Sequence, residues 1–375
     1  MTKATKQISK LFAAMVLAGV ASHSFAADTI KIGIAGPKTG PVTQYGDMQF
    51  VGAKQAIKDI NAKGGVDGKM LEAMEYDDAC DPKQAVAVAN KVVNDGVKFV
   101  VGHLCSSSTQ PASDIYEDEG VIMITPAATS PEITARGYKL VFRTIGLDSA
   151  QGPAAGNYIA DHVKPKVVAV LHDKQQYGEG IASAVKQTLE KKGVKVAVFE
   201  GLNAGDKDFS SIIQKLKQNN VDFVYYGGYH PELGLILRQS KEKGLNAKFM
   251  GPEGVGNDSI SQIAQGASEG LLVTLPKSFD ADPENQAIVA AIKADGKDPS
   301  GPFVFPAYSA VELIAEGIKA AKSEDTAKVS EAIHKGTFKT PTGELSFNEK
   351  GDLKDFKFVV YQWHFGKPKT EVSPQ

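Results

Sequence analysis

Residues 97–131 read VKFVVGHLCSSSTQPASDIYEDEGVIMITPAATSP, and this stretch decides the fold. Two apolar runs within it, 97–101 and 121–124, have the composition of buried parallel strands. Residues 109–119 between them are enough for a helix, and parallel neighbouring strands need a crossover of this kind. The stretch therefore predicts a strand–helix–strand unit of an open parallel sheet.

Hydroxyl groups follow both predicted strands. They belong to Ser106, Ser107, Ser108 and Thr109 after the first strand, and to Thr125 and Thr129 after the second. In an open parallel sheet, ligands bind beyond the carboxyl ends of the strands, where backbone N–H groups and the positive end of a helix also point. The pattern favours a site for a carboxylate. Helix capping is the alternative, since Ser and Thr are frequent N-caps and Pro111 suits a first helical turn.

Length and composition narrow the class of protein. The chain has 375 residues, which is too many for one ordinary domain and suits two. Hydrophobic residues make up 42% and charged residues 23%, a balance typical of globular proteins and not of disordered ones. The formal net charge of −2 provides no attraction to nucleic acid, and we expect no nucleic-acid partner.

The first 26 residues have the pattern of a secretory signal peptide. It consists of the positive residues Lys3, Lys6 and Lys10, an apolar core at 11–20 and the cleavage signal Ser24-Phe25-Ala26. We expect cleavage after Ala26 and a protein located in the periplasm, with secretion to the medium as the alternative. No later segment reaches the roughly 18–20 apolar residues that a membrane span needs.

The two cysteines, Cys80 and Cys105, each follow a predicted strand. Because export brings the chain into an oxidising compartment, a disulfide is the expected state. A catalytic thiol, or a zinc site that includes His103, is the alternative. Neither is supported by a second His or Cys cluster at metal-ligand spacing, so we expect no metal site.

Strands and helices alternate in two series. The first has strands at 30–35, 70–76, 97–101, 121–124 and 140–145 and helices at 47–62, 82–94 and 109–119. The second has strands at 167–171, 194–199, 223–226, 248–250 and 271–274 and helices at 152–162, 178–192, 209–219 and 232–243. This alternation predicts an α/β protein with two doubly wound lobes. After Pro276 we expect helices at 285–294, 307–322 and 327–334, a hairpin at 343–352 and a strand at 356–363, all packed on the lobes.

Catalytic signatures are missing from the sequence. The GxSxG, GxGxxG and HExxH motifs are absent, Gly68-Lys69 does not complete a P-loop, and DDACDPK lacks the glycine and distal glutamate of an EF-hand. His172 and His230 follow strands, but neither has a nucleophile and an orienting partner nearby in sequence. We expect neither an enzyme nor a cofactor. A periplasmic hydrolase that uses a hydroxyl of residues 106–108 is the enzymatic alternative.

Residues at other strand ends complete a ligand shell. Tyr45, Tyr177 and Tyr229 each follow a predicted strand, and Glu253 lies between glycines in GPEGVGN. Each of these residues by itself is commonly a packing or loop residue. Together they offer rings for an apolar group and a carboxylate for a cation, while the hydroxyls of the first lobe suit an anion. A zwitterionic amino acid with a hydrophobic side chain fits this set.

Longer blocks of sequence carry a resemblance. They are YDDACDPKQAVAVANKVVNDG (76–96), HLCSSSTQPASDIYEDEG (103–120), MITPAAT (123–129), HDKQQYGEG (172–180), DFVYYGGYHPE (222–232), FMGPEGV (249–255) and NEKGDLKDF (348–356). These blocks resemble the periplasmic leucine/isoleucine/valine-binding proteins of branched-chain amino-acid ABC transporters. The likeness covers nearly the whole chain after residue 26 and is far more specific than a short motif.

The resemblance implies the type I periplasmic binding protein fold, in which a three-segment hinge joins two lobes. The expected division is a signal peptide at 1–26, lobe 1 at 27–147 and 277–356, and lobe 2 at 148–276 and 357–375. The resemblance also implies a branched-chain amino acid as ligand, an inner-membrane ABC permease complex as partner, and a monomer. An amino-acid sensor with the same fold is the alternative function.

The resemblance further implies a set of ligand residues. Ser106 and Thr129 would bind the ligand carboxylate through hydroxyl and backbone N–H groups, while the Ala127 carbonyl, Thr129 and Glu253 would hold the ammonium. The wall around the side chain would consist of Tyr45, Leu104, Tyr177, Tyr229 and Phe303. Cys80 and Cys105 match the disulfide of the family. A leucine-selective relative carries Trp at the position of Tyr45, so Tyr indicates a broader branched-chain range, with alanine and threonine left open.

Overall fold

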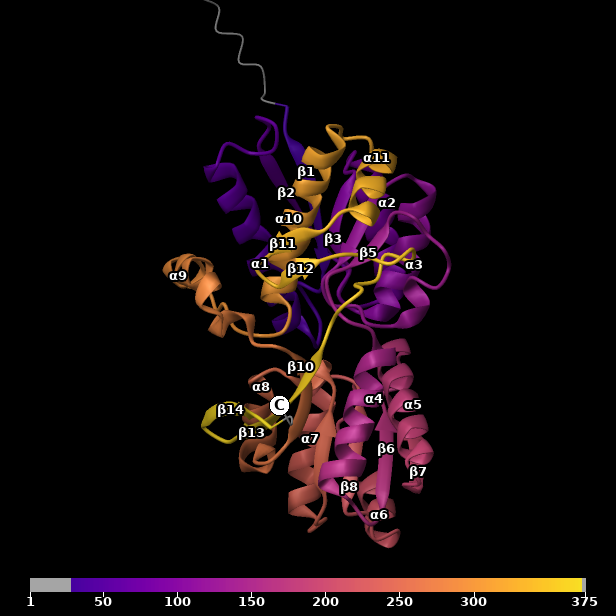
Figure 1. Cartoon of the computed structure of the whole chain (residues 1–375). Helices are drawn as coiled ribbons and strands as arrows, with labels where there is room; N and C mark the ends of the chain where they lie inside the picture. Colours follow the sequence, from indigo (N-terminus) through magenta and orange to yellow (C-terminus); the bar gives the residue numbers. More distant parts are fainter. Residues whose placement is uncertain (1–27, 373–375) are drawn as a thin grey trace, which may run out of the picture.

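The computed structural model describes residues 28–372 and consists of two α/β lobes stacked end to end (Figure 1). The α/β class and the two doubly wound lobes agree with the prediction from sequence. The predicted signal peptide, residues 1–26, lies outside the described residues. Within residues 28–372, no helix combines the length and the apolar character that crossing a membrane would require.

Lobe 1 is built on a parallel sheet with strand order β2-β1-β3-β4-β5. Its strands are β1 (Ile30–Gly36), β2 (Leu71–Asp77), β3 (Phe99–Gly102), β4 (Ile122–Thr125) and β5 (Val141–Arg143). Its helices are α1 (Thr43–Ala62), α2 (Pro82–Asn94), α3 (Ser106–Asp118), α9 (Gln286–Ala294), α10 (Val304–Ala321) and α11 (Thr326–Lys335), and a small hairpin pairs β11 (Phe338–Thr340) with β12 (Gly343–Leu345). Because helices cover both faces of the sheet, its central strands β3 and β4 are buried along their whole length.

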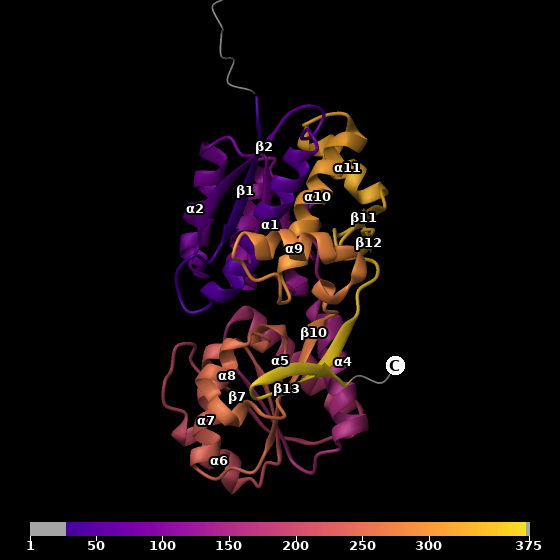
Figure 2. The same ribbon diagram turned by 90° about the vertical axis from the view of Figure 1, so that its left-hand side faces the viewer.

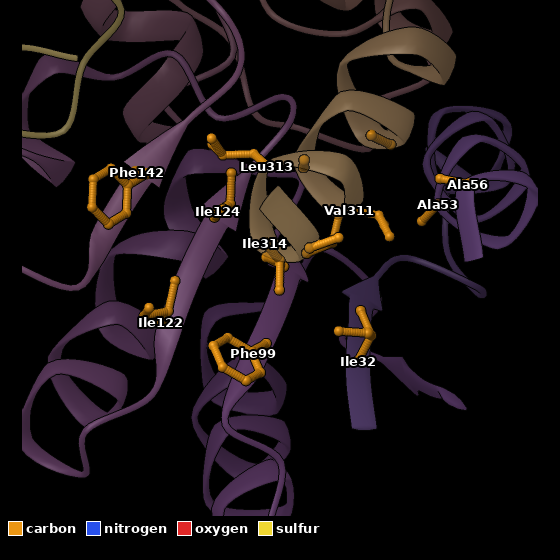
Figure 3. Packing of buried hydrophobic residues seen from close by; sticks show 14 of the residues in the cluster. Ile32, Ala53, Ala56, Phe99, Ile122, Ile124, Phe142, Val311, Leu313 and Ile314 are labelled. Carbon is orange, nitrogen blue, oxygen red and sulfur yellow. The ribbon is translucent and has the colours of Figure 1, made fainter. Parts of the chain in front are cut away.

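The core of lobe 1 joins segments that lie far apart in the sequence. Figure 3 shows Val311, Leu313 and Ile314 of α10 among side chains of the sheet. The sheet residues in this cluster are Ile32, Phe99, Ile122, Ile124 and Phe142, and all of them are fully buried or nearly so. Burying one such side chain contributes about 1.5–3 kcal/mol. The apolar face of α10 is therefore part of the folding core of lobe 1.

Lobe 2 is built on a mixed sheet with strand order β14-β13-β10-β9-β8-β6-β7. The strands are β6 (Val168–His172), β7 (Val196–Gly201), β8 (Phe223–Gly227), β9 (Lys248–Gly251), β10 (Leu272–Pro276), β13 (Phe358–His364) and β14 (Lys367–Glu371). The helices are α4 (Asp148–Tyr158), α5 (Gln176–Lys191), α6 (Ser210–Gln218), α7 (His230–Glu242) and α8 (Ser259–Ala264). Single helical turns include η2 (Ile159–Val163) after α4 and η3 (Glu253–Val255) after β9.

The chain passes between the lobes three times (Figure 2). It does so from β5 to α4, from β10 towards α9, and from β12 to β13. The first and third passages pack against each other at Gly146, where an added Cβ would lie 2.4 Å from Cδ1 of Phe356 and 2.7 Å from Cε2 of Phe358. Glycine is required there because a side chain would push the two passages apart.

Several helices begin earlier than the sequence predicts. α1 begins at Thr43 instead of 47, α3 at Ser106 instead of 109, α5 at Gln176 instead of 178 and α10 at Val304 instead of 307. Hydrophobic periodicity detects only the part of a helix whose apolar stripe packs on the sheet. The first turns of these helices point towards the other lobe, so the periodicity does not detect them. Site residues that we expected in turns therefore lie in or directly before helices.

One prediction near the carboxyl end is wrong, and two elements were not predicted. The hairpin lies at 338–345, between β11 and β12, and not at 343–352, where Phe347 makes an isolated bridge to Leu353. The turn of the hairpin lies at Pro341–Thr342, ahead of the glycine that suggested it. Strand β14 and helix α8 were not predicted, because the first is polar and exposed and the second is short.

Candidate ligand-binding site

A small buried cavity lies between the lobes, with an empty volume of about 210 Å³. Lobe 1 contributes Leu104, Ser106, Ala127 and Phe303 to its wall, and lobe 2 contributes Tyr177, Tyr229, Glu253 and Gly254. Every lining residue except Gly254 is among the predicted ligand residues. The other two predicted residues, Tyr45 and Thr129, contact Gly254 and Glu253. The structure thus brings the whole predicted set together.

Ser106 stands at the beginning of α3, where the helix dipole is positive. It is 2% exposed, and its Oγ accepts a hydrogen bond of 3.3 Å from the backbone N–H of Ser130. The hydroxyl proton of Ser106 remains available to another acceptor. The N-cap of α3 is Cys105, with no side-chain capping bond, so helix capping does not explain this serine.

Thr125 shapes the turn that follows β4. Its hydroxyl donates to the carbonyl oxygen of His103 at 2.7 Å and accepts from the backbone N–H groups of Ala127 at 3.3 Å and Ala128 at 2.9 Å. Such a local hydroxyl–backbone motif fixes a turn without regular secondary structure. The turn holds Ala127 in the cavity wall.

Arg143 supports the same turn from behind. Its guanidinium donates to the carbonyl oxygens of Ala128 at 2.7 Å and Ser130 at 3.1 Å, and its Nε lies 2.8 Å from Oδ1 of Asp352. Arginine and aspartate are both buried, and a buried charge of this kind needs such a partner. The loop that carries Thr129 is therefore rigidly positioned.

Glu253 is the acid of the site. It begins η3, is 1% exposed, and its Oε1 accepts a hydrogen bond of 3.4 Å from the hydroxyl of Thr129 across the lobe interface. Burial raises the pKa of Glu253 to about 7, against the lowering effect of hydrogen bonds that include those from Gln151 and Tyr177. Within residues 28–372, no hydrogen bond of normal geometry reaches its Oε2. A buried and incompletely compensated carboxyl suits a cationic group.

Aromatic rings from both lobes form one wall. Tyr45 in the first turn of α1 lies edge-on to Phe303 at 5.4 Å between ring centroids and to His230 at 5.3 Å. Tyr229 lies 6.4 Å from Tyr45 and 5.3 Å from Tyr177 by the same measure. These spacings are typical of favourable aromatic pairs, so the wall is a packed apolar surface.

Gly254 connects this wall across the interface. The hydroxyl of Tyr45 donates to its carbonyl oxygen at 2.8 Å, and its backbone N–H donates to the hydroxyl of Tyr177 at 3.0 Å. A Cβ at this position would lie 2.6 Å from the carbonyl oxygen of Gly228 and 2.7 Å from Cε1 of Tyr177. The loop with Glu253 approaches the rings this closely because the next residue is glycine.

Sequence reasoning missed several residues at the site. His230 was considered only as a catalytic residue, whereas burial lowers its pKa to about 4 and its ring packs on Tyr45. Its position directly after Tyr229 was the available signal. Gly254, Asp148 and Gln151 were not singled out, because nothing in their local sequence marks them as neighbours of Glu253.

A polar contact between the lobes lies outside the cavity. Gln176 at the beginning of α5 donates from Nε2 to Oε1 of Gln110 on α3, to Oγ of Ser130 at 3.2 Å and to Oε2 of Glu132 at 3.3 Å. None of these side chains lines the cavity; Ser130 is buried, and the other three are at least partly exposed. The contact joins the two lobes outside the cavity, and the backbone N–H of Ser130 connects it to Ser106 in the cavity wall.

The two cysteines form a disulfide with 5.6 Å between their Cα atoms, which confirms the expected state. The bond ties the beginning of α3 to the loop after β2. His103, the residue of the zinc alternative, is fully buried; its Nδ1 lies 2.6 Å from Oδ2 of Asp78 and its Nε2 lies 3.1 Å from the hydroxyl of Tyr116. These contacts indicate that His103 has a structural role next to the disulfide.

A larger cleft, with an empty volume of about 1840 Å³ by the same measure, opens beside α1 and α9. Three of the five lysines that line it form surface ion pairs, Lys38 and Lys54 with Glu75 and Lys58 with Asp295. Such exposed pairs contribute little individually. The convergence of hydroxyls, rings and a buried acid occurs in the small cavity and not in this cleft.

Comparison with known proteins identifies the family of this chain. The sequence profile of the family described as periplasmic binding protein matches residues 29–368, and the chain belongs to this family. Over 373 residues it is 68% identical to the leucine-, isoleucine-, valine-, threonine- and alanine-binding protein of Pseudomonas aeruginosa, with 100% of both chains covered. It is 56% identical to the Leu/Ile/Val-binding protein of Escherichia coli over 362 residues, covering 96% of this chain and 98% of the relative.

Solved structures agree with the fold. The leucine-binding protein of Thermotoga maritima superposes with a TM-score of 0.85 at 27% identity, over 92% of this chain and 98% of the other. A branched-chain amino-acid transporter substrate-binding protein of Streptococcus pneumoniae, in complex with isoleucine, superposes with a TM-score of 0.84 at 26% identity, over 92% and 100%. The type I periplasmic binding protein fold expected from the sequence is confirmed.

Proposed function

We propose that this protein binds leucine, isoleucine and valine between its two lobes and delivers them to an ABC permease in the inner membrane. Threonine and alanine are included as further ligands, because the relative from Pseudomonas aeruginosa is named for all five amino acids. The proposal includes no catalytic step. The relatives reported above are binding proteins.

One observation carries the proposal. A single buried cavity is surrounded by a hydroxyl at a helix N-terminus, an acid and a set of rings, contributed by both lobes. Ser106 and Thr129 would receive the carboxylate of the amino acid through hydroxyl and backbone N–H groups. Glu253, the hydroxyl of Thr129 and the carbonyl of Ala127 would receive its ammonium. The apolar side chain would lie against Tyr45, Leu104, Tyr177, Tyr229 and Phe303.

The energetics of this arrangement suffice for tight binding. Burying a leucine side chain contributes about 3 kcal/mol, at about 0.8 kcal/mol per methylene-sized group. Hydrogen bonds with a charged partner contribute about 1.5–3 kcal/mol each, and the zwitterion makes them at both ends. A micromolar dissociation constant requires only about −8 kcal/mol.

Binding would close the lobes about the three passages of the chain. We place the boundaries at 27–147 and 277–356 for lobe 1 and at 148–276 and 357–375 for lobe 2. A ligand favours closure only through its better affinity for the closed state. The division of the polar contacts between the lobes supplies that difference, because an open site offers the ligand only half of them.

The location follows from the same proposal. The mature chain would begin after Ala26 and work as a monomer in the periplasm, between the outer membrane and the permease. The family of the chain carries this location in its name.

Isothermal titration of the mature protein against the standard amino acids tests the proposal. The protein should be unfolded and refolded first, so that ligand carried through purification is removed. We expect micromolar or tighter binding of leucine, isoleucine and valine, and no heat with acidic or basic amino acids. Thermal stabilisation by leucine without consumption of leucine would distinguish binding from hydrolysis. The absence of binding to every branched-chain amino acid would refute the proposal.

A further inference from the structure

Asp148 is a buried acid beside the site that the proposed binding mode does not use. It is the first residue of α4, it is 2% exposed, and its backbone N–H donates to the carbonyl oxygen of Thr129 at 3.0 Å. Within residues 28–372, neither of its carboxyl oxygens has a hydrogen bond of normal geometry, although the hydroxyl of Thr129 is close enough to favour its charged form. A buried carboxylate without donors destabilises the state that buries it.

Asp148 and Glu253 compete for the same hydroxyl. Thr129 has a single hydroxyl proton, and it donates to Oε1 of Glu253 at 3.4 Å. The same proton cannot serve Asp148 at the same time. Oε2 of Glu253 and Oε1 of Gln151, which lies one turn along α4 from Asp148, also have no donor in the described part of the chain. The closed site therefore holds several buried acceptor oxygens that no donor of the described residues reaches with normal geometry.

The surrounding groups neutralise the two acids only in part. Arg143 faces Asp148 from β5 and acts to lower its pKa, but the same guanidinium pairs with Asp352, so one positive charge serves two carboxyl groups. Burial raises the pKa of the tyrosines that face Glu253, so that they stay neutral: Tyr45, Tyr177, Tyr225 and Tyr229. Burial and then repulsion by Glu253 raise the pKa of Asp148 well above its ordinary value.

An ammonium group supplies what this cluster lacks, namely three N–H donors and a positive charge. An amino acid whose ammonium lies at Glu253 and Thr129 would offset the repulsion between the acids. A carboxylic acid with the same side chain but no amine would leave Glu253 without a counter-charge and Asp148 with only the charge of Arg143 that it shares with Asp352.

We infer that Asp148 is a selectivity residue which, together with Glu253, makes closure of the lobes conditional on a positively charged amine in the ligand. The inference rests on the proposed function. Asp148 does not line the cavity and acts through Thr129 and Glu253, so it is a positioning residue. It raises the free energy of the closed state for every ligand that lacks the cation, and closure then becomes unfavourable for that ligand.

The test compares leucine with 4-methylpentanoate, which is leucine without its amine, by titration calorimetry at about pH 7.5. The wild-type protein should bind leucine and discriminate strongly against the analogue. In Asp148→Asn the ratio of the two dissociation constants should fall at least about tenfold, because binding of the analogue improves. Asp148→Glu should restore the wild-type ratio. Glu312→Gln, which changes a largely buried acid on α10 in lobe 1, is the matched control and should leave the ratio unchanged.

The pH dependence separates this role from a structural one. As the pH falls from about 8 to about 6, the acids with raised pKa values take up a proton and lose the charge that opposes closure. The wild-type protein should then bind 4-methylpentanoate more tightly, and Asp148→Asn should show a smaller gain. The wild-type measurement needs no variant and stands even if Asp148→Asn does not fold.

Two results would overturn the inference while leaving the proposed function intact. In the first, a folded Asp148→Asn variant binds leucine, and its ratio of dissociation constants for 4-methylpentanoate and leucine equals that of the wild type. In the second, this ratio does not change with pH in the wild-type protein. The absence of leucine binding by the wild-type protein is a different result, because it refutes the proposed function and this inference with it.

Discussion

Replacing Glu253 with glutamine removes one charge from the centre of the site and changes little else. The side chain is 1% exposed, and glutamine has nearly the same shape. The hydroxyl of Thr129, 3.4 Å from Oε1, can still donate to an amide oxygen in the same place. The ammonium of a bound amino acid loses its counter-charge and meets an uncharged amide. The substitution therefore tests the role of the charge and not of the packing.

The expected loss is large. Removing one member of a buried, hydrogen-bonded charge pair costs about 2–5 kcal/mol. A loss of about 3 kcal/mol corresponds to roughly a hundredfold weaker binding of leucine, since about 1.4 kcal/mol is a factor of ten. Affinity for isoleucine and valine should fall by the same factor, because all three ligands share the ammonium.

The substitution should weaken ligand binding but should not lower the thermal stability of the ligand-free protein. Burial raises the pKa of Glu253 from 4.5 to about 7, so the native state holds its proton more tightly than the unfolded state does. The contribution of this group to the free energy of unfolding therefore falls as the pH rises from about 4.5 to about 7 and stays low above that range. Glutamine carries no such charge, and above pH 7 the variant should melt at the same temperature as the wild type or higher.

Titration calorimetry and thermal unfolding of the refolded proteins measure the two effects. Glu312→Gln again serves as the control, because burial raises the pKa of Glu312 to about 7 in a part of lobe 1 outside the cavity wall. Unchanged leucine affinity in a folded Glu253→Gln variant would refute the assignment of the ammonium to this acid. A large fall in melting temperature would show instead that Glu253 has a structural role that this reasoning does not include.

Three further perturbations follow from the structure. Tyr45→Trp, which loses the 2.8 Å bond to Gly254 and enlarges the wall, should narrow binding towards leucine; equal affinities for valine and leucine by calorimetry would contradict the proposed wall. Gln176→Ala removes the contact between lobes outside the cavity and should weaken all ligands alike by roughly fivefold, about 1 kcal/mol; a change in their ranking would place Gln176 in the selectivity machinery. Reducing Cys80–Cys105, which span 25 residues, should lower the free energy of unfolding by about 3–4 kcal/mol in denaturant titrations, and an unchanged midpoint would count against that estimate.

The alternation of strands and helices is readable from the sequence because parallel strands buried on both faces are short apolar runs, and their crossover helices carry an amphipathic stripe. The same logic led to the residues around the cavity. Ligands in open α/β sheets lie beyond the carboxyl ends of strands, so Tyr177, Tyr229 and Glu253 could be named from their positions alone. Family likeness then added Leu104 and Phe303, whose residue types are those of any core position.

Chain order alone does not place residues from different lobes opposite one another. The contact of Asp148 with Thr129, the bond from Tyr45 to Gly254 and the reach of Gln176 to Gln110 join segments between 19 and 209 residues apart. Periodicity and turn chemistry report interactions within a few residues, whereas these contacts depend on how two separately formed sheets meet. The sequence by itself determined two α/β lobes and the chemical character of each strand end. Only the tertiary structure decided which acid faces which hydroxyl, because the charge balance of the buried site arises where the lobes pack together.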